Sequence, residues 1–307
     1  MLIPLFPEFA PVSLELKDAL QPALKAAKDG VSEFTFANLY LFRGRYNYMV
    51  SQERNGNVLL SGGIHGKKFF ATPCAPPELP VLEELLAGHD YWKGVSESVL
   101  ESGRDLIEGL GLEIAEDRDN FDYLYNKTDL ALLSGKKFHK KRNLLNAFLL
   151  SYPDHEDYPL TKEYTPAALA VLDRWREDKG ETGDFVAARE ALLLSSELGL
   201  EGRIYFVNKH PAGYCLGEYV RGDSMFAVHF EKCIDEYKGI YQAVNQFFAA
   251  SLPPECLYVN REQDLGDKGL RQAKMTYRPC GFVKKHTVEA VPKLQFWGDK
   301  LRLSSNL

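Results

Sequence analysis

The chain has 307 residues, 45% of them hydrophobic and 26% charged, which is the composition of an ordinary globular protein. Its 37 Lys and Arg against 43 Asp and Glu give a formal net charge of −6, so strong binding to duplex DNA, which depends on neutralising phosphates, is not expected. No run of about 18 apolar residues occurs and no basic residue precedes Lys17, so we expect neither a membrane-spanning helix nor a secretory signal. At about 150 residues per domain, the length predicts two domains.

The cysteine residues indicate a reducing, cytoplasmic setting, and neither the cysteines nor the histidines predict a metal site. The five cysteines are odd in number and contain no C-x-x-C pair, so neither a disulfide framework nor a cysteine zinc site is expected. The seven histidines show no H-E-x-x-H pattern or other paired spacing, so no metal site is predicted. Nothing in the sequence signals a particular oligomeric state.

The first half of the chain is predicted to alternate between short helices and short strands. Turn signals at Asn55-Gly56 and His65-Gly66 separate three runs typical of strands. Apolar residues recur at helical spacing on either side of these runs. The predicted helices are 15–28, 80–87 and 96–109, and the predicted strands are 46–52, 58–62, 68–71, 112–115 and 121–125.

The second half gives clearer signals. Thr165-Pro166 is typical of an N-cap followed by proline at the first helical position, and Pro253-Pro254 end a helix that begins near residue 240. The predicted order is two helices, three strands, a helix, a strand, a helix and two strands. The ranges are 166–178, 184–198, 203–208, 214–220, 225–230, the helix from 240, 257–259, 267–277, 282–291 and 293–303.

A polar stretch with two prolines, 151–159, lies between the two halves. Such composition is typical of a connection between domains. We therefore predict an N-terminal domain of residues 1–150 and a C-terminal domain of residues 151–307.

The segment Ala273-Lys-Met-Thr-Tyr277-Arg-Pro-Cys-Gly281-Phe282 resembles the late helix-to-strand motif A-x-x-x-Y-x-x-x-G-F of GNAT-type acyltransferases. The predicted order of elements before it is also that of the GNAT fold. The resemblance implies that Tyr277 is the general acid toward a leaving group, although Leu270 stands where the family frequently has Asn. The alternative is that Tyr277 is a core residue whose hydroxyl is bonded within the protein.

The segment from Glu236 to Tyr241 lies where GNAT enzymes carry Q/R-x-x-G-x-G/A, a helix N-terminus that binds the pyrophosphate of coenzyme A. Gly239 matches, but Glu236 replaces Gln or Arg and Tyr241 replaces Gly or Ala. A carboxylate and a bulky ring are unfavourable beside a pyrophosphate, so acetyl-coenzyme A is the less favoured donor. We predict that Lys238, Gly239 and Tyr241 bind another phosphate or acyl group. The alternative is that Gly239 only caps a structural helix.

A run of basic residues follows Ser134-Gly135 in this acidic chain. On a helix, residues 136 and 140, like residues 137 and 141, would form like-charge pairs at i and i+4, which are destabilising unless something negative compensates. The predicted ligand is phosphate-rich: a nucleotide, the acceptor end of a tRNA or a phospholipid headgroup. The alternative is a solvated helix near acidic residues. The predicted binding residues are Lys136, Lys137, His139, Lys140, Lys141 and Arg142.

Longer strings carry a more specific resemblance. Residues 36–42, 121–143, 237–246 and 259–274 are similar to an uncharacterised bacterial family that resembles the C-terminal domain of phosphatidylglycerol lysyltransferase. The resemblance covers essentially the whole chain and implies an α+β fold of two tandem GNAT-like domains, each a mixed, mostly antiparallel sheet flanked by helices. Its aminoacyl-tRNA-dependent relatives move an aminoacyl group from tRNA to a lipid headgroup or a peptide. Because this chain shows no membrane helices, an acceptor in a bilayer is not implied.

Polar residues beside the predicted central strands complete the candidate site. Glu218 or Asp264 is predicted to orient the acceptor, and Asn260 and Arg261 are predicted to bind the aminoacyl group. His229, on the predicted central hairpin, is a weaker candidate of the same kind. The alternative for each is a solvent-facing or salt-bridged side chain, or a helix cap.

These features predict a cytoplasmic acyl or aminoacyl transferase that uses aminoacyl-tRNA, or another phosphate-containing donor, and a soluble amine or hydroxyl acceptor. Backbone N–H groups beside the central strand would stabilise the oxyanion. One alternative is a non-catalytic ligand-binding protein on a degenerate GNAT fold, which Glu236 and Tyr241 favour. Another is an RNA-binding module built around the basic run.

Overall fold

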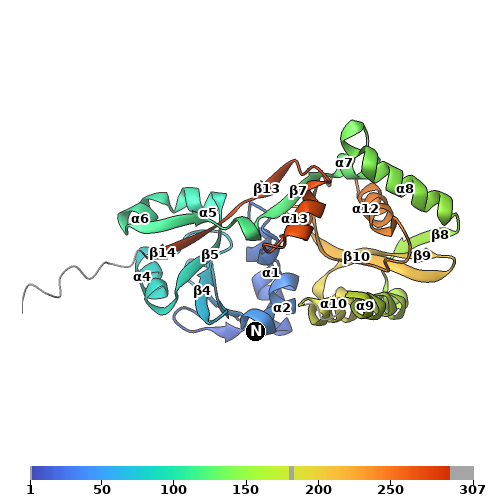
Figure 1. Ribbon diagram of the computed structural model, residues 1–307. Coiled ribbons are helices and arrows are strands. Elements are labelled where there is room, and N and C mark those ends of the chain that lie inside the picture. Colours follow the sequence, from blue (N-terminus) through green and yellow to red (C-terminus); the bar gives the residue numbers. More distant parts are fainter. Residues whose placement is uncertain (1, 180–182, 291–307) are drawn as a thin grey trace, which may run out of the picture.

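Two sheets form the framework of the computed structural model, which describes residues 2–179 and 183–290 (Figure 1). Within these residues the strand order is β1-β2-β3-β4-β5-β14-β6 in the first sheet and β13-β7-β12-β11-β10-β9-β8 in the second. The pairs β4·β5 and β11·β12 are parallel and the other pairs between named strands are antiparallel. The predicted α+β class, with two mixed and mostly antiparallel sheets flanked by helices, is confirmed.

The first sheet is built mainly from the N-terminal part of the chain. Its strands are β1 (Ala10–Pro11), β2 (Met49–Gln52), β3 (Val58–Ile64), β4 (Lys67–Ala71), β5 (Tyr91–Ser96), β6 (Leu112–Glu116) and β14 (Lys285–Ala290). The helices and 3-10 turns of this part are η1 (Leu14–Leu16), α1 (Lys17–Lys25), η2 (Ser32–Phe34), α2 (Phe36–Leu41), α3 (Arg43–Tyr46), α4 (Leu79–Gly88), α5 (Glu97–Ser102), α6 (Arg104–Gly109) and η3 (Arg118–Asn120).

The second sheet follows in the chain. Its strands are β7 (Asp122–Asn126), β8 (His155–Pro159), β9 (Glu201–Val207), β10 (His210–Val220), β11 (Met225–Cys233), β12 (Tyr258–Asn260) and β13 (Gly281–Val283). The helices and 3-10 turns of this part are α7 (Lys127–Leu132), η4 (Lys136–Phe138), α8 (His139–Ser151), η5 (Lys162–Tyr164), α9 (Thr165–Lys179), α10 (Phe185–Leu193), α11 (Ser195–Leu198), α12 (Ile240–Ser251) and α13 (Lys268–Met275).

Most of the element order predicted for the second half is confirmed. Helices α9 and α10 precede β9, β10 and β11, and α12, β12 and α13 then follow as predicted. The predicted strand 282–291 is wrong as a single strand, because β13 and β14 belong to different sheets. The predicted strand 293–303 lies outside the described residues.

The sequence patterns of the first half reveal only part of its structure. Strands β2, β3 and β4 and helix α4 are confirmed. The predicted helix 96–109 is two helices, α5 and α6, which meet at Gly103, where an added Cβ would lie 3.1 Å from the Cβ of Pro76. Helix α2 escapes detection because all six of its residues are buried. A helix that is buried on every side has no polar face to reveal its period.

The predicted boundary segment 151–159 takes part in the second sheet. Its residues His155–Pro159 form β8, which pairs antiparallel with β9 at the edge of that sheet. The chain passes between the sheets elsewhere, once between β6 and β7 and once between β13 and β14. The division into domains 1–150 and 151–307 stays a prediction, whereas sheet membership by itself would group residues 122–283.

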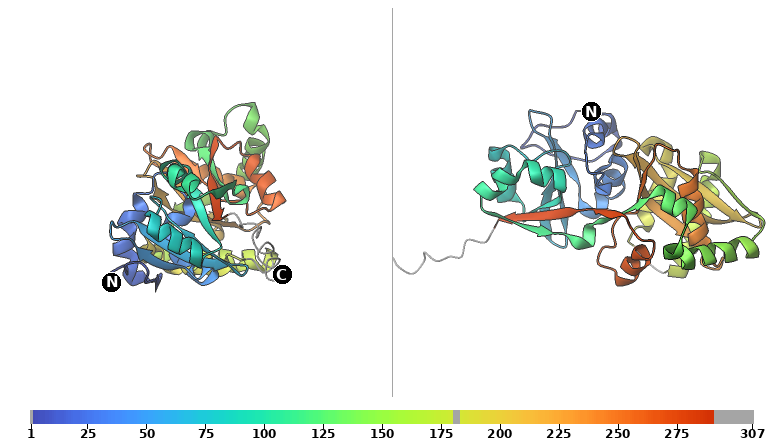
Figure 2. Two further views of the ribbon diagram at one scale, coloured as in Figure 1. Left: turned by 90° about the vertical axis from the view of Figure 1, so that its left-hand side faces the viewer. Right: turned by 90° about the horizontal axis from the view of Figure 1, so that it is seen from above.

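Two stretches that are far apart in the sequence run antiparallel from one sheet to the other (Figures 1 and 2). Strand β14 pairs with β6, with His286 opposite Glu116, and β13 pairs with β7, with Val283 opposite Asp122. We call the stretches β6–β7 and β13–β14 the crossing ribbon. Since each stretch has one strand in each sheet, the ribbon ties the two sheets together.

A buried group of charges lies where the ribbon crosses. The Nζ of Lys285 donates to Asp122 Oδ1 at 2.7 Å and to the carboxylate of Glu33, and the side chains of Lys285 and Asp122 are completely buried. Asp122 also accepts from the Ser32 N–H at 2.9 Å and from Gln263 Nε2 at 2.7 Å. Burial by itself lowers the pKa of Lys285, but the two carboxylates outweigh burial and raise that pKa.

Apolar packing joins the same two parts of the chain. Phe42, which follows α2, stacks on Phe230 of β11 with ring centroids 6.5 Å apart. Arg43 of α3 pairs with Glu190 of α10 at 2.8 Å. One continuous core cluster contains side chains of α1 and α2 together with side chains of α9, α10 and the second sheet.

Replacing Lys285 with Met is predicted to lower the free energy of unfolding by about 3–5 kcal/mol, because Asp122 and Glu33 would keep buried charges without a cation. Urea unfolding followed by circular dichroism measures the difference. The matched control is Lys284→Met, since Lys284 forms an exposed pair with Glu116 at 3.4 Å. Such a pair contributes under about 1 kcal/mol. Equal losses in the two variants would contradict the prediction.

Candidate functional site

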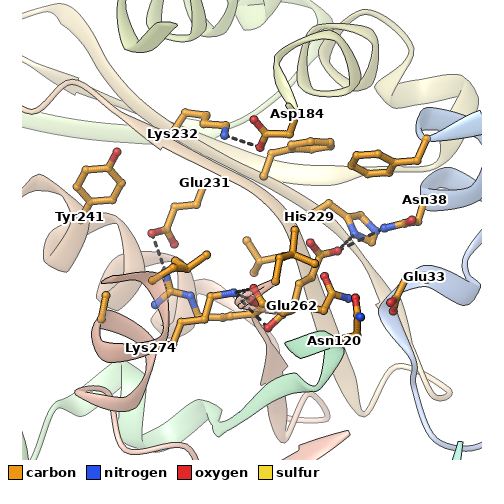
Figure 3. A pocket seen from close by; sticks show the side chains of 18 of the residues that line it. Glu33, Asn38, Asn120, Asp184, His229, Glu231, Lys232, Tyr241, Glu262 and Lys274 are labelled. Carbon is orange, nitrogen blue, oxygen red and sulfur yellow. Dashed lines mark hydrogen bonds and ion pairs between the residues drawn. The ribbon is translucent and has the colours of Figure 1, made fainter. Parts of the chain in front are cut away.

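A cavity of about 640 Å³ lies between the two parts of the chain (Figure 3). Its walls come from η2, α2, α3 and β5 on one side and from α8, α9, β11, α12, α13 and the loop after β12 on the other. The aromatic lining residues are Phe42, Tyr46, Tyr48, Trp175, Phe230, Tyr241 and Tyr277. The basic lining residues are Arg45, Lys93, Lys141, His229, Lys232, Arg261 and Lys274, and the acidic ones are Glu33, Asp184, Glu231 and Glu262. The cavity is therefore rich in positive charge although the whole chain is acidic.

A β-bulge in β11 places His229 at the cavity wall. Along the β10–β11 pair, Leu216 lies opposite Phe230 and Gly217 opposite Val228, which leaves His229 without a partner. An extra residue of this kind bends the strand and re-aims a side chain, and bulges are frequent beside active sites. Gly217 permits the close approach of the strands, because an added Cβ would lie 1.9 Å from the carbonyl oxygen of residue 227.

The imidazole of His229 is held between two carboxylates. Its Nδ1 lies 2.7 Å from Glu262 Oε1 and its Nε2 lies 3.2 Å from Glu218 Oε1, while only 1% of the side chain is exposed. Burial by itself lowers the pKa of His229, but the two carboxylates outweigh burial and raise the pKa to about 10. His229 is therefore an imidazolium at neutral pH and donates from both ring nitrogens. We call these three residues the histidine trio.

The backbone of Glu262 is held in a rare conformation. Its φ of 54° lies in the left-handed region, which residues other than glycine seldom adopt. Its N–H donates to Asn260 Oδ1 at 2.8 Å. The Nζ of Lys274 donates to the carbonyls of Arg261 at 2.6 Å and Glu262 at 3.1 Å, and also to that of Gln263. Rare conformations that are fixed by several bonds cluster at active sites.

Two further ion pairs line the cavity. Lys232 pairs with Asp184 at 2.6 Å, and its Nζ lies 3.6 Å from the centre of the Trp175 ring. Arg261 pairs with Glu231 at 2.8 Å. Burial, together with the nearby charge of Arg261, lowers the pKa of Lys274 to about 8. The carboxylates at this wall are thus already engaged by cations of the protein.

Four of the residues predicted from sequence meet in the cavity: Lys141, Tyr241, Arg261 and Tyr277. The Nζ of Lys141 lies 4.1 Å from the centre of the Tyr277 ring. Burial and the charge of Arg261 lower the pKa of Lys141, whereas burial raises the pKa of Tyr277 to about 12. The Tyr241 hydroxyl donates to the Cys233 carbonyl at 3.3 Å.

Two other predicted residues, Glu218 and Asn260, are buried close to the cavity but do not line it. Glu218 reaches the cavity wall only through His229. Asn260 is completely buried, and its Nδ2 donates to Asp122 Oδ2 at 3.0 Å and to the Gly30 carbonyl at 3.1 Å. Asn260 therefore binds other parts of the chain.

Asp264, which was predicted to orient the acceptor, is also fully buried outside the cavity lining. It accepts from Tyr123 Oη at 2.6 Å, from Arg271 Nε at 2.9 Å and from the Gly266 N–H at 2.9 Å. Burial by itself raises the pKa of Asp264, but these donors outweigh burial and hold the pKa well below its usual range. The carboxylate is thus enclosed by donors of the protein and fixes the loop before α13.

The predicted basic run occupies η4 and the start of α8. Lys141 is its one member in the cavity lining within the part of the chain that the structure describes. Lys136, Lys137, His139 and Lys140 are exposed, and Arg142 is half-buried. Lys137 pairs with Asp129 at 2.8 Å, and Arg142 Nη1 donates to the Gly135 carbonyl at 3.1 Å. Most of the run is thus a solvent-facing surface that adjoins the cavity at Lys141.

Gly239 caps α12 and packs against α8. Its φ is 90°, and an added Cβ would lie 2.5 Å from the carbonyl oxygen of Leu144. Lys238 beside it is exposed, and Glu236 pairs with Arg174 at 3.7 Å. Because α8 covers this helix N-terminus and a carboxylate stands next to it, the residues here do not fit the pyrophosphate of coenzyme A.

The sequence does not predict the cavity wall that the N-terminal part of the chain forms. Glu33 and Asn38 line the cavity, and Asn38 Nδ2 lies 3.5 Å from Glu262 Oε1. A signal for Asn38 exists, because it is the only strongly polar residue in the apolar run 36–42. Lys274 occupies a variable position of the motif that contains Tyr277, and its spacing alone does not predict a function for its side chain.

Comparisons with known proteins identify the family and the fold of the chain. The model of the family described as phosphatidylglycerol lysyltransferase, C-terminal, matches residues 25–288, and the chain belongs to that family. A conserved protein of unknown function from Bacteroides thetaiotaomicron has a TM-score of 0.82 and 28% identity, with 92% of this chain and 99% of that chain covered. No helix within residues 2–179 and 183–290 has the length and apolar character needed to cross a membrane.

Two more distant structures share the fold. A C-terminal domain attributed to lysylphosphatidylglycerol synthetase from Agrobacterium fabrum has a TM-score of 0.59 and 14% identity, with 88% of this chain and 92% of that chain covered. FemX has a TM-score of 0.56 and 8% identity, with 92% and 97% covered. The expected fold of tandem GNAT-like sheets is confirmed.

Proposed function

We propose that this family member is a transferase that moves an aminoacyl group from aminoacyl-tRNA, or another phosphate-containing donor, to an amine or hydroxyl acceptor. The observation that carries the proposal is the cavity of about 640 Å³, in which Lys141, Glu262 and Tyr277 line one space. The family description, which names a lysyltransferase, supports an aminoacyl group as the transferred unit. The free thiols of all five cysteines suit the reducing cytoplasm, where we propose that the protein acts.

The cavity contains a proton acceptor and a proton donor for this reaction. As the acceptor attacks the ester carbonyl, a new bond to carbon forms and the acceptor releases a proton to Glu262. The bond between carbon and the leaving oxygen then breaks, and Tyr277 donates its proton to that oxygen. With a pKa of about 12, Tyr277 keeps its proton at neutral pH and is therefore ready to donate it. Glu262 takes the role predicted for Glu218 or Asp264.

The charges around the cavity favour a phosphate-bearing donor. Seven basic side chains line the cavity against four acidic ones. Lys141 is the first cation of α8 inside the cavity, and the exposed Lys136 and Lys140 continue the positive surface outward. We propose that the 3′ end of the donor enters beside Lys141 and that its phosphates lie along η4 and α8.

The first test is thermal-shift screening with 3′-aminoacylamino-3′-deoxyadenosines, which cannot hydrolyse, and with acetyl-coenzyme A. At about 100-fold above Kd, a ligand of the native state adds about 2.7 kcal/mol, which raises Tm by several degrees. We expect a shift with an aminoacyl analogue and none with acetyl-coenzyme A. Ala273→Trp, which fills the cavity from an exposed position, should abolish the shift, whereas Gln272→Trp on the same helix should keep it.

The same screen can reject the proposal. A shift with acetyl-coenzyme A alone would contradict an aminoacyl donor. An aminoacyl shift that survives Ala273→Trp would place the ligand outside this cavity. Binding that is never accompanied by transfer would favour the alternative, a non-catalytic binding protein with a transferase fold. The residues around Gly239, which do not fit the pyrophosphate of coenzyme A, also favour that alternative.

The general-acid role of Tyr277 predicts a loss of rate without a loss of binding. Tyr277→Phe should lower kcat by about 100-fold or more, because proton donation to the leaving oxygen is removed while the ring still fills its place. The assay follows the release of labelled amino acid from charged tRNA with hydroxylamine as the acceptor. Tyr152→Phe, a half-buried tyrosine outside the cavity lining, is the control and should keep its rate. An unchanged kcat in Tyr277→Phe would reject the general-acid role and show that Tyr277 only packs in the core.

The placement of the donor predicts that the basic run contributes to tRNA affinity. Replacing Lys136 and Lys140 together with Glu should weaken binding of tRNA by about tenfold or more at 0.1 M salt, because phosphate contacts are lost. Filter binding at several salt concentrations measures both the affinity and its salt dependence. Lys67→Glu with Lys68→Glu changes the net charge equally at two exposed positions at the start of β4 in the first sheet. Equal weakening in the two double variants would reject a specific role for the run.

A further inference from the structure

The histidine trio carries one more negative charge than positive charge. Two carboxylates, Glu218 and Glu262, flank one imidazolium, His229, at 3.2 and 2.7 Å. Glu218 does not line the main cavity, whereas Glu262 does. The surplus negative charge is therefore accessible from the cavity at the carboxylate of Glu262.

The neighbouring charged groups do not remove this surplus. On α13, Lys274 directs its Nζ to three backbone carbonyls. On β14, Lys285 bonds the carboxylates of Asp122 and Glu33. Lys274 and, on β11, Lys232, which pairs with Asp184, act on the Glu262 carboxylate only from a distance, and Asp122 of β7 acts in the opposite direction.

On the other side of His229, Glu218 likewise has no second cation among the ion pairs of the described residues. Glu218 borders a small cavity of about 80 Å³ together with Lys25 of α1 and with Arg221 and Asp223 of the β10–β11 turn. Among the ion pairs within the described residues, Glu218 has His229 as its cation. Burial raises the pKa of Glu262, and the contact with His229 opposes this rise without cancelling it. That direction fits a carboxylate that lacks full compensation.

We propose, resting on the transferase function above, that Glu262 is the binding site for a primary ammonium group of a substrate. That group is either the α-ammonium of the aminoacyl donor or the amine of the acceptor, and Glu262 is the proton acceptor of the transfer only in the second case. An ammonium supplies the charge that the trio lacks and donates hydrogen bonds to the carboxylate of Glu262, a residue whose backbone Lys274 and Asn260 already hold in place. The buried setting strengthens the attraction relative to water.

In this arrangement Glu218 is a positioning residue. It keeps His229 protonated and thereby sets the net charge that a ligand meets at Glu262. If Glu218 is replaced by Gln, the remaining pair of His229 and Glu262 is neutral as long as the imidazole is charged. The pair regains one negative charge only when His229 loses its proton.

The experiment follows the ring signals of His229 by NMR in protein labelled with ¹⁵N at histidine. The probes are ethylamine against ethanol, and the 3′-aminoacylamino-3′-deoxyadenosine with a free amine against its N-acetylated form. We expect ethylamine to shift the His229 signals and ethanol to have no effect. Glu262→Gln should weaken ammonium binding at least tenfold, whereas Glu163→Gln, an exposed site on η5, should leave it unchanged.

The variant Glu218→Gln tests the positioning role through the pH dependence of ethylamine binding, which would not change if Glu218 had a purely structural role. In the wild-type protein, ethylamine binding should be nearly constant between pH 6 and 7, because His229 with a pKa of about 10 and Lys274 with a pKa of about 8 both stay mostly charged. In Glu218→Gln, binding should be weaker at pH 6 and should recover in step with the loss of the His229 proton. This arm remains decisive even if Glu262→Gln does not fold.

The outcomes separate this proposal from the transferase function. Equal effects of ethylamine and ethanol, or ethylamine binding that is unaffected by Glu262→Gln, would overturn the ammonium site. Failure of both nucleoside analogues, while ethylamine still binds at Glu262, would overturn the aminoacyl donor and leave the ammonium site standing. A preference for the free over the acetylated analogue identifies the donor amine, and ethylamine binding beside the bound analogue identifies the acceptor amine.

Discussion

The buried pair of Lys285 and Asp122 is the interaction on which the rest of the structure depends. It joins the two strands of the crossing ribbon at the point where the chain leaves one sheet for the other. A lysine without solvent exposure is tolerated only where carboxylates replace its water, so the sheets cannot slide without separating these charges. The same aspartate binds Ser32 and Gln263, which are the sequence neighbours of the cavity residues Glu33 and Glu262. The contact that fixes the sheets therefore also fixes both walls of the cavity.

Two costly local features coincide at the histidine trio. The bulge at His229 breaks the ladder between β10 and β11, and Glu262 holds a left-handed backbone conformation. Neither feature helps the sheet, and each depends on further residues, Gly217 for the bulge and Lys274 for the loop. Strain that is gathered at one place and supported from several elements is typical of a functional site rather than of a stabilising one.

Local sequence patterns predict individual helices, strands and motifs, but they do not predict contacts between segments that are far apart in the chain. The hairpin of β10 and β11 and the helices α12 and α13 follow from periodicity and turn residues, and Tyr277, Tyr241, Arg261 and Lys141 were found through motifs within these elements and the adjoining basic run. Glu33 and Asn38 reach the cavity only because the crossing ribbon brings the N-terminal part against β11, which no local pattern encodes. Asp264 looks the same in the sequence whether its carboxylate meets a ligand or Arg271, and only its partners decide.

The negative net charge of the chain does not describe the cavity, where basic side chains outnumber acidic ones. A wall that ends in the surplus carboxylate of Glu262 faces the same cavity as Lys141, beyond which the exposed lysines of η4 and α8 continue to the surface. A ligand with an ammonium at one end and phosphate at the other would be oriented by this field in only one direction. In that direction the ester between the two ends lies within the space that Tyr277 lines, because Lys141 stands over the Tyr277 ring. Charge placement would thus bring the ester of such a ligand to the residue that we propose to protonate its leaving group.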